Sequence, residues 1–190
     1  MKLLTQALDH HASVRGDQLA LRFLETGDVD GLKWEITYSE FRDLARKIAA
    51  KLQASVDAGE RVLLLYDGGM EFVLGFYGCL YAGVIAVPTY PPDPGRIHRT
   101  LPRLQAIAKD AGAVAVLTTQ AILDSAEPLC AEVEGLAELT WLASNNLPEQ
   151  LDPFEPAPLD FQQLSYLQYT SGSTGTPKGV MVTRSNLAHT

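Results

Sequence analysis

Residues 61–88 read RVLLLYDGGMEFVLGFYGCLYAGVIAVP, and this stretch decides the fold. Residues 61–66 form a nearly continuous apolar run, which is typical of a strand covered on both faces. Residues 69–82 predict a buried helix, and the β-branched stretch 84–87 predicts a second strand. A strand, a helix and a second strand in this order predict a parallel unit with a right-handed crossover.

The same stretch raises the question of a membrane span, because residues 72–87 carry no charge. A transmembrane helix needs about 20 apolar residues, and this segment is shorter. Gly75, Gly78 and Gly83 also interrupt it, and its last residues favour a strand. We therefore interpret it as a buried helix followed by a buried strand, and we expect no integral membrane segment.

Helices and strands alternate on both sides of this unit. On the carboxyl side the pattern predicts helices over 97–110 and 120–133 and strands over 113–118 and 139–142. On the amino side it predicts a hairpin of residues 18–24 and 32–36, followed by an amphipathic helix that begins with the capping box Thr37-Tyr38-Ser39-Glu40. The predicted fold class is therefore α/β, with a mostly parallel, doubly wound sheet and flanking helices.

Composition and charge exclude several classes of protein. The chain has 190 residues, of which 46% are hydrophobic and 20% are charged, as in a globular protein rather than a disordered or collagen-like one. Its 15 Lys and Arg residues against 23 Asp and Glu residues leave a net charge of −8, which argues against a nucleic-acid partner. Cys79 and Cys130 form no metal-binding or disulfide pattern, and the amino terminus does not read as a secretory signal. We therefore expect a cytoplasmic protein.

The chain divides into three predicted parts. Residues 1–143 are the first α/β portion, and residues 144–160, with four prolines and four acidic residues, predict an exposed connector. Residues 161–190 contain two predicted strands, 164–170 and 179–183, and the start of a helix. Because that helix stops after one turn, we expect the sequence to be the amino-terminal part of a longer protein.

The loop between the last two strands carries the chemistry. Residues 169–179 read YTSGSTGTPKG, in which each residue of 170–176 is a glycine or carries a hydroxyl group. Glycines let backbone N–H groups face a ligand, and hydroxyls add donors that match phosphate oxygens. Lys178 is the only charged residue between Phe161 and Thr183, so it offers the phosphates a single cation. The candidate phosphate ligands are Thr170, Ser171, Gly172, Ser173, Thr174, Gly175, Thr176 and Lys178.

Two other interpretations of this loop have to be weighed. A flexible, solvated hairpin loop has the same composition, but hairpin loops usually run about 2 to 5 residues and need no apolar strands on both sides. A Walker A loop requires the lysine directly after a glycine, whereas Gly175 and Lys178 are three positions apart. The spacing therefore excludes a P-loop NTPase.

Residues 169–180, YTSGSTGTPKGV, resemble the phosphate-binding signature of the adenylate-forming superfamily, which includes acyl-CoA synthetases, luciferases and the adenylation domains of peptide synthetases. Residues 37–40 and 80–88 are similar to its early helix-start and helix-to-strand motifs, and they follow in the same order. The resemblance thus covers nearly the whole chain. It implies that the sheet is part of the large amino-terminal domain of such an enzyme.

Within that superfamily, three segments are similar to the fatty acyl-AMP ligases. They are PTYPPDP at 88–94, RLQAIA at 103–108 together with DAGA at 110–113, and LQYTSGS at 167–173. For the proline cluster the alternative is a polyproline ligand of an SH3-type partner. One position departs from the family, which commonly has a histidine where this chain has Arg184. An arginine there could still serve an anionic ligand.

The resemblance implies a fatty acid as substrate and ATP with Mg²⁺ as cofactors. It assigns residues 170–175 to the β- and γ-phosphates, Lys178 as the catalytic residue that stabilises charge on the leaving pyrophosphate, and Thr174 to the metal. It also implies an acyl carrier protein, or a carrier domain of a polyketide or peptide synthase, as the partner that takes the acyl group on its phosphopantetheine.

The resemblance places the adenine pocket, the acyl pocket and a late catalytic lysine beyond Thr190, so we expect the 190 residues alone to be inactive. A long-chain acyl-CoA ligase and an amino-acid adenylation domain share the same phosphate loop and remain alternatives. A non-catalytic module that keeps only the fold is a third alternative.

Overall fold

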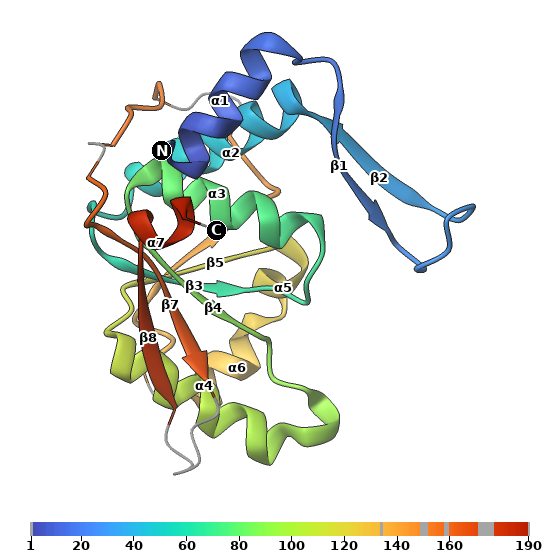
Figure 1. The fold of residues 1–190 in the computed structure, drawn as a ribbon. Coiled ribbons are helices and arrows are strands. Elements are labelled where there is room, and N and C mark those ends of the chain that lie inside the picture. The colour runs from blue at the N-terminus through green and yellow to red at the C-terminus, as the bar shows by residue number, and fades with distance from the viewer. Residues whose placement is uncertain (1, 134, 149–151, 158–159, 171–176, 190) are drawn as a thin grey trace.

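A computed structural model describes residues 2–133, 135–148, 152–157, 160–170 and 177–189 (Figure 1). Within these ranges six strands form one sheet in the order β6-β5-β3-β4-β7-β8. Neighbouring strands from β6 to β7 pair in parallel, and β8 pairs antiparallel with β7. This confirms the predicted α/β class with a mostly parallel sheet. The strands are β3 (Arg61–Leu65), β4 (Ile85–Thr89), β5 (Ala115–Thr118), β6 (Thr140–Ala143), β7 (Leu164–Thr170) and β8 (Lys178–Thr183).

Helices cover both faces of the sheet. Val62 and Leu64 of β3 lie in a core with helices α1 (Leu4–Val14), α2 (Tyr38–Gln53) and α3 (Met70–Ala82). Leu63 and Leu65 lie in a second core, with α4 (Ile97–Ala111) and residues of α6 (Ala126–Glu132). All four side chains are at most 1% exposed. The apolar run of β3 is continuous because alternate side chains are buried on opposite faces of the sheet, as predicted.

Helix α3 packs directly against α2, and Figure 1 shows the two helices side by side. At Gly78 an added Cβ would lie 2.5 Å from Cγ2 of Ile48, so glycine permits the close approach. The helix ends at Gly83, whose φ of 79° favours glycine. Across the described residues, no helix combines the length and apolar character needed to cross a bilayer. The uncharged segment is therefore a buried helix followed by a strand, as predicted.

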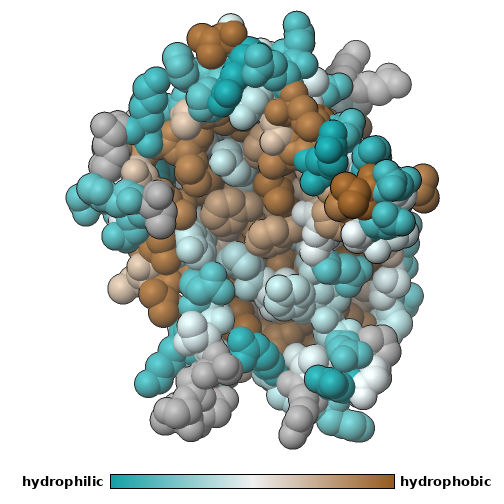
Figure 2. Space-filling view, turned by 45° about the vertical axis from the view of Figure 1, so that its right-hand side comes forward, coloured by the Kyte–Doolittle hydropathy of each residue, from teal (hydrophilic) through white to brown (hydrophobic). Residues whose placement is uncertain are grey.

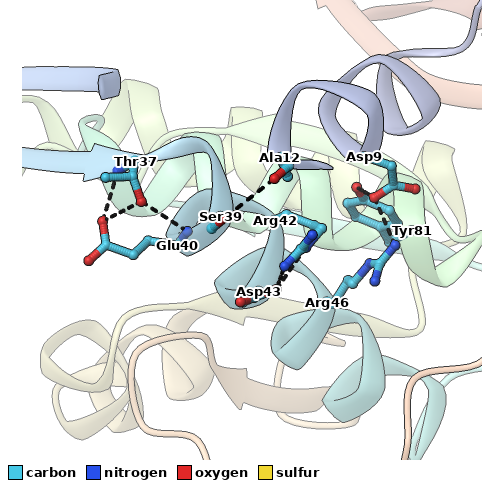
Figure 3. Close-up of polar contacts among 9 residues, drawn as sticks. All are labelled: Asp9, Ala12, Thr37, Ser39, Glu40, Arg42, Asp43, Arg46 and Tyr81. Atoms are coloured by element: carbon cyan, nitrogen blue, oxygen red, sulfur yellow. Dashed lines mark hydrogen bonds and ion pairs between the residues drawn. The ribbon is translucent and has the colours of Figure 1, made fainter. Parts of the chain in front are cut away.

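The amino-terminal hairpin projects from the body of the molecule (Figure 1). Its strands β1 (Leu19–Leu24) and β2 (Lys33–Thr37) pair antiparallel and form a separate two-stranded sheet. Thr37 then begins α2 through the predicted capping box, shown in Figure 3. The Thr37 hydroxyl accepts from the Glu40 N–H at 3.3 Å, and the Glu40 carboxylate accepts from the Thr37 N–H at 2.8 Å.

Two helical features differ from the prediction. Residues 120–133 form two helices, α5 (Gln120–Asp124) and α6, because the helix breaks at Ser125. Pro128 has no N–H to donate to the Asp124 carbonyl, so one continuous helix is disfavoured. Helix α1 was not expected from the sequence. Its Asp9 carboxylate accepts from the Tyr81 hydroxyl at 2.6 Å and pairs with Arg46 at 2.8 Å (Figure 3), so tertiary contacts hold it.

The predicted connector is largely exposed where the structure describes it. Phe154 is an exception, because its ring lies 5.5 Å from the Tyr81 ring and packs against the first core. The Gln53 amide also donates to the Glu155 carbonyl at 2.7 Å. The division into residues 1–143, 144–160 and 161–190 stays a prediction, although β7 and β8 extend the sheet formed by the first part.

Candidate phosphate-binding site

The phosphate loop begins at the carboxyl end of β7. This strand runs parallel to β4, with Tyr166 opposite Ala86, and β8 returns antiparallel beside it. Thr170 pairs with Lys178, so the two ends of the loop meet on one rung, and both residues are exposed. The predicted ligands Ser171, Gly172, Ser173, Thr174, Gly175 and Thr176 lie outside the described residues.

The next rung fixes the base of the loop and was not foreseen from the sequence. Tyr169 pairs with Gly179, and its ring lies so close that a Cβ on Gly179 would be 3.0 Å from the Tyr169 Cζ. The Tyr169 hydroxyl donates to the Asp110 carboxylate of α4 at 2.5 Å. Burial, followed by the Asp110 carboxylate, raises the pKa of the Tyr169 phenol, which therefore stays protonated near neutral pH.

An apolar cavity of about 590 Å³ opens beside this rung. Aromatic side chains form much of its wall, including Phe72 and Phe76 of α3 and Tyr66 in the loop after β3. The Phe76 and Tyr166 rings stand edge to face at 5.5 Å. Arg103 of α4 and Gln168 of β7 add polar groups. Apolar side chains gather across the middle of the face in Figure 2, with hydrophilic ones around them.

The cavity lies at the carboxyl ends of the parallel strands β4 and β7. In open α/β sheets, ligands bind in crevices outside the carboxyl ends of the strands. Thr89 at the end of β4 and Tyr169 near the end of β7 both line the cavity. The cavity and the phosphate loop therefore share one edge of the sheet.

Arg184 lies at the opposite end of β8 from Lys178. It is only 7% exposed, and its guanidinium donates to the Leu80 carbonyl in the last turn of α3 at 3.3 Å. Burial lowers the pKa of this guanidinium. The sequence left open a role for Arg184 with an anionic ligand of the loop. The structure instead places it at the carboxyl end of a helix, where cations are favoured by the helix dipole.

Among the residues that the structure describes, no three His, Cys, Asp or Glu side chains gather as metal ligands. Thr174, the predicted Mg²⁺ ligand, lies outside those residues. The described part of the site offers hydroxyl, amide and cationic groups beside an apolar wall, and its one named carboxylate, Asp110, accepts a hydrogen bond from Tyr169. Such groups suit an anion joined to an apolar body better than they suit a bare cation.

A comparison with known proteins gives the family. The model for AMP-binding enzymes matches residues 8–190. This chain belongs to the AMP-binding enzyme family. The predicted resemblance to adenylate-forming enzymes is thereby confirmed, and the matched range includes the segment between β7 and β8.

Individual relatives of this AMP-binding chain are fatty acid ligases. The chain is 43% identical to the medium-chain fatty acid acyl-carrier-protein ligase JamA of Moorena producens, covering 98% of this chain and 31% of JamA. It is 35% identical to the long-chain fatty acid AMP ligase FadD32 of Mycolicibacterium smegmatis, covering 95% of this chain and 29% of FadD32. The chain thus spans about a third of the length of these relatives.

The fold of the AMP-binding chain also matches a solved structure. The fatty acyl-adenylate ligase of L. pneumophila, in complex with acyl adenylate and pyrophosphate, superimposes with a TM-score of 0.82 at 30% identity. The match covers 98% of this chain and 31% of that ligase. It confirms that the sheet and its helices have the architecture of the amino-terminal portion of an adenylate-forming enzyme.

Proposed function

We propose that the protein containing these residues joins a fatty acid to ATP, forming acyl-AMP and pyrophosphate, and passes the acyl group to the phosphopantetheine of an acyl carrier protein. The observation that carries this proposal is the Thr170–Lys178 rung beside the apolar cavity. It brings a phosphate-binding loop and space for an apolar chain to one edge of the sheet. The similarity to JamA and FadD32 supports both the substrate and the acceptor.

The chemistry asks little covalent work of the protein. A fatty acid carboxylate oxygen attacks the α-phosphorus of ATP, and the bond to the pyrophosphate oxygen breaks. Both reactants are anions, so the protein must hold them together and neutralise the charge that builds on the leaving group. In our proposal residues 170–176 donate hydrogen bonds to the β- and γ-phosphates, and the Lys178 ammonium stabilises the departing pyrophosphate.

Mg²⁺ is proposed as the companion of ATP, since the ion neutralises phosphate charge when bound. A threonine hydroxyl is a suitable oxygen ligand, and we keep Thr174 as the proposed residue of this chain that contacts the metal.

A cytoplasmic location is part of the same proposal. Cys79 and Cys130 are both free thiols, as expected for a reducing compartment. ATP and carrier proteins are the partners that such a compartment would provide. No nucleic-acid partner is proposed, because the net charge is −8.

The first test is pyrophosphate exchange by the full-length protein with ATP and a series of fatty acids. We expect exchange that depends on the fatty acid, and none with amino acids. The product is then offered to a holo carrier protein and to coenzyme A in parallel. Acyl transfer to coenzyme A alone would favour the acyl-CoA ligase alternative, and exchange with amino acids alone would favour a peptide-synthetase adenylation domain.

The second test concerns residues 1–190 expressed by themselves. We expect no acyl-adenylate, because the relatives that carry the activity are about three times as long. Robust acyl-adenylate formation by this chain would contradict the proposal that essential groups lie elsewhere in the enzyme. A full-length protein that exchanges with no carboxylate would instead support a non-catalytic module.

A further inference from the structure

We propose that Tyr169 and Asp110 are positioning residues that hold the base of the phosphate loop at a fixed place for ATP. This inference rests on the proposed function and deepens it, since it names groups outside the loop on which nucleotide binding depends. Neither residue is a catalytic residue. Their role is to set where Thr170 and Lys178 stand relative to the sheet.

The Tyr169 ring is fixed by packing. Its side chain is 6% exposed and lies in the second core with Val87 of β4 and Ile107 of α4. The ring position therefore depends on the apolar core, whereas the hydroxyl adds the bond to Asp110 at 2.5 Å. A hydrogen bond to a carboxylate is stronger than one between neutral groups. This bond fastens β7 to α4 one residue before the loop begins.

The same ring fixes the returning strand. Among the described residues, strand β8 lies at the edge of the sheet and pairs only with β7, so the position of β7 determines where Lys178 stands. Gly179 follows Lys178 directly, and the Tyr169 ring lies so close to it that an added Cβ would be 3.0 Å from Cζ, which is tighter than an ordinary van der Waals contact. An aromatic ring over a cross-strand glycine is a known device for pinning strand register. Tyr169 thus contacts the chain on both sides of the loop, since it belongs to β7 and its ring packs on Gly179 of β8.

The chain contains a matched control. Tyr81 also donates its hydroxyl to a carboxylate, that of Asp9, at 2.6 Å, and its ring is likewise buried. That bond fastens α1 to α3 and lies away from the loop (Figures 1 and 3). Replacing either tyrosine by phenylalanine removes a single hydroxyl from a Tyr–Asp pair. A difference between the two variants therefore reports on position in the fold rather than on the loss of a buried hydrogen bond.

The experiment uses the full-length enzyme and compares Tyr169→Phe, Asp110→Ala, Asp110→Asn and Tyr81→Phe. We expect Tyr169→Phe and Asp110→Ala each to raise the KM for ATP by about three- to tenfold, the scale of one charge-assisted hydrogen bond. The KM for the fatty acid should change less than twofold. Asp110→Asn keeps an acceptor oxygen and should restore most of the ATP affinity, whereas Tyr81→Phe should lower only the melting temperature.

A double-mutant cycle tests whether the two groups act through each other. Tyr169→Phe combined with Asp110→Ala should cost no more than either change alone, because both remove the same bond. Gly179→Ala keeps both side chains but displaces the ring, and should raise the KM for ATP as well. Additive effects in the cycle, or an unchanged KM for ATP in Tyr169→Phe, would overturn the proposal. An equal rise in Tyr81→Phe would do the same, since general destabilisation would then explain it.

Calorimetric titration with ATP separates this inference from the proposed function. It measures nucleotide binding directly, without a fatty acid and without turnover. If the wild-type protein exchanges pyrophosphate with no fatty acid, the proposed substrate is wrong, and weaker ATP binding by Tyr169→Phe still supports the positioning pair. Equal ATP binding by wild type and Tyr169→Phe would refute the pair even if fatty acid adenylation is confirmed.

Discussion

Thr170 and Lys178 face each other across the last described rung of the β7–β8 pair. The lysine therefore starts a strand instead of sitting at the tip of a loop, and backbone hydrogen bonds to β7 fix the origin of its side chain. In the proposed reaction, a lysine whose backbone is fixed in this way would need little backbone rearrangement to meet the charge that develops on the leaving pyrophosphate.

Replacing Lys178 by alanine should lower the adenylation rate of the full-length enzyme by about tenfold or more, the scale of one lost charged contact in the transition state. The rate is measured by fatty-acid-dependent pyrophosphate exchange. Lys47→Ala, which removes an exposed lysine on α2, is the control and should leave the rate unchanged. A rate equal to that of wild type would remove Lys178 from the mechanism.

Arg184→Ala should affect stability and spare nucleotide binding. The variant loses the hydrogen bond to the buried Leu80 carbonyl, which we expect to cost about 1 to 3 kcal/mol of unfolding free energy. Denaturant unfolding of the full-length protein measures that loss, and the KM for ATP should stay within twofold of wild type. A large rise in the KM for ATP with little change in stability would contradict this prediction and would indicate that Arg184 contacts the ligand.

Gly78→Ala should destabilise the protein although alanine favours helices. The added methyl group would lie 2.5 Å from Cγ2 of Ile48, and overpacking of this kind costs about 1 to 3 kcal/mol. Thermal unfolding tests the change. Combining it with Ile48→Ala removes the nearest obstructing atom, Cγ2, and leaves Cβ of residue 48 at 2.9 Å, so the double variant should lose less stability than the sum of the single variants. Strict additivity would show that the contact is not the cause.

The capping box predicts a pH effect. The Thr37 backbone N–H, and then its hydroxyl, lower the pKa of the Glu40 carboxyl. A carboxyl with a lowered pKa in the folded state stabilises the protein above its ordinary pKa of about 4.3, and this contribution disappears as pH falls through the folded value. Wild type should thus exceed Glu40→Gln in unfolding free energy at pH 7 and converge with it at acidic pH. A constant difference across the range would contradict the assignment.

The sequence predicted a strand or a helix start correctly where the pattern depends only on residues that are close together in the chain. The alternate faces of residues 61–66 and the reciprocal bonds of Thr37 with Glu40 follow from spacing within a few residues. The prediction of one helix over 120–133 was wrong, because the chain breaks into two helices at Ser125. The prediction followed the helical periodicity and gave too little weight to Pro128, which has no N–H to donate. Helix α1 was missed because its anchors, Arg46 and Tyr81, come from other helices.

In the candidate site, too, one part could be predicted from neighbouring residues and another part depends on the tertiary structure. The glycines and hydroxyl groups of residues 170–176, with Lys178, predict a phosphate loop because they follow one another within a few positions of the sequence. Nothing in the sequence pairs Tyr169 with Asp110, which are 59 positions apart. The aromatic residue before the loop is a signal in itself. Its partner becomes visible only when α4 packs against the sheet.

By itself, the sequence predicted most of the strands and helices in their order, the candidate phosphate loop and the family, because these depend on residue type and spacing along the chain. The tertiary structure alone decided that Arg184 serves α3, that an apolar cavity adjoins the loop, and that Tyr169 joins β8 to α4. The physical reason is that hydrogen bonds and packing act over a few ångströms. Contacts between residues distant in the chain exist only once the sheet has brought them to one edge.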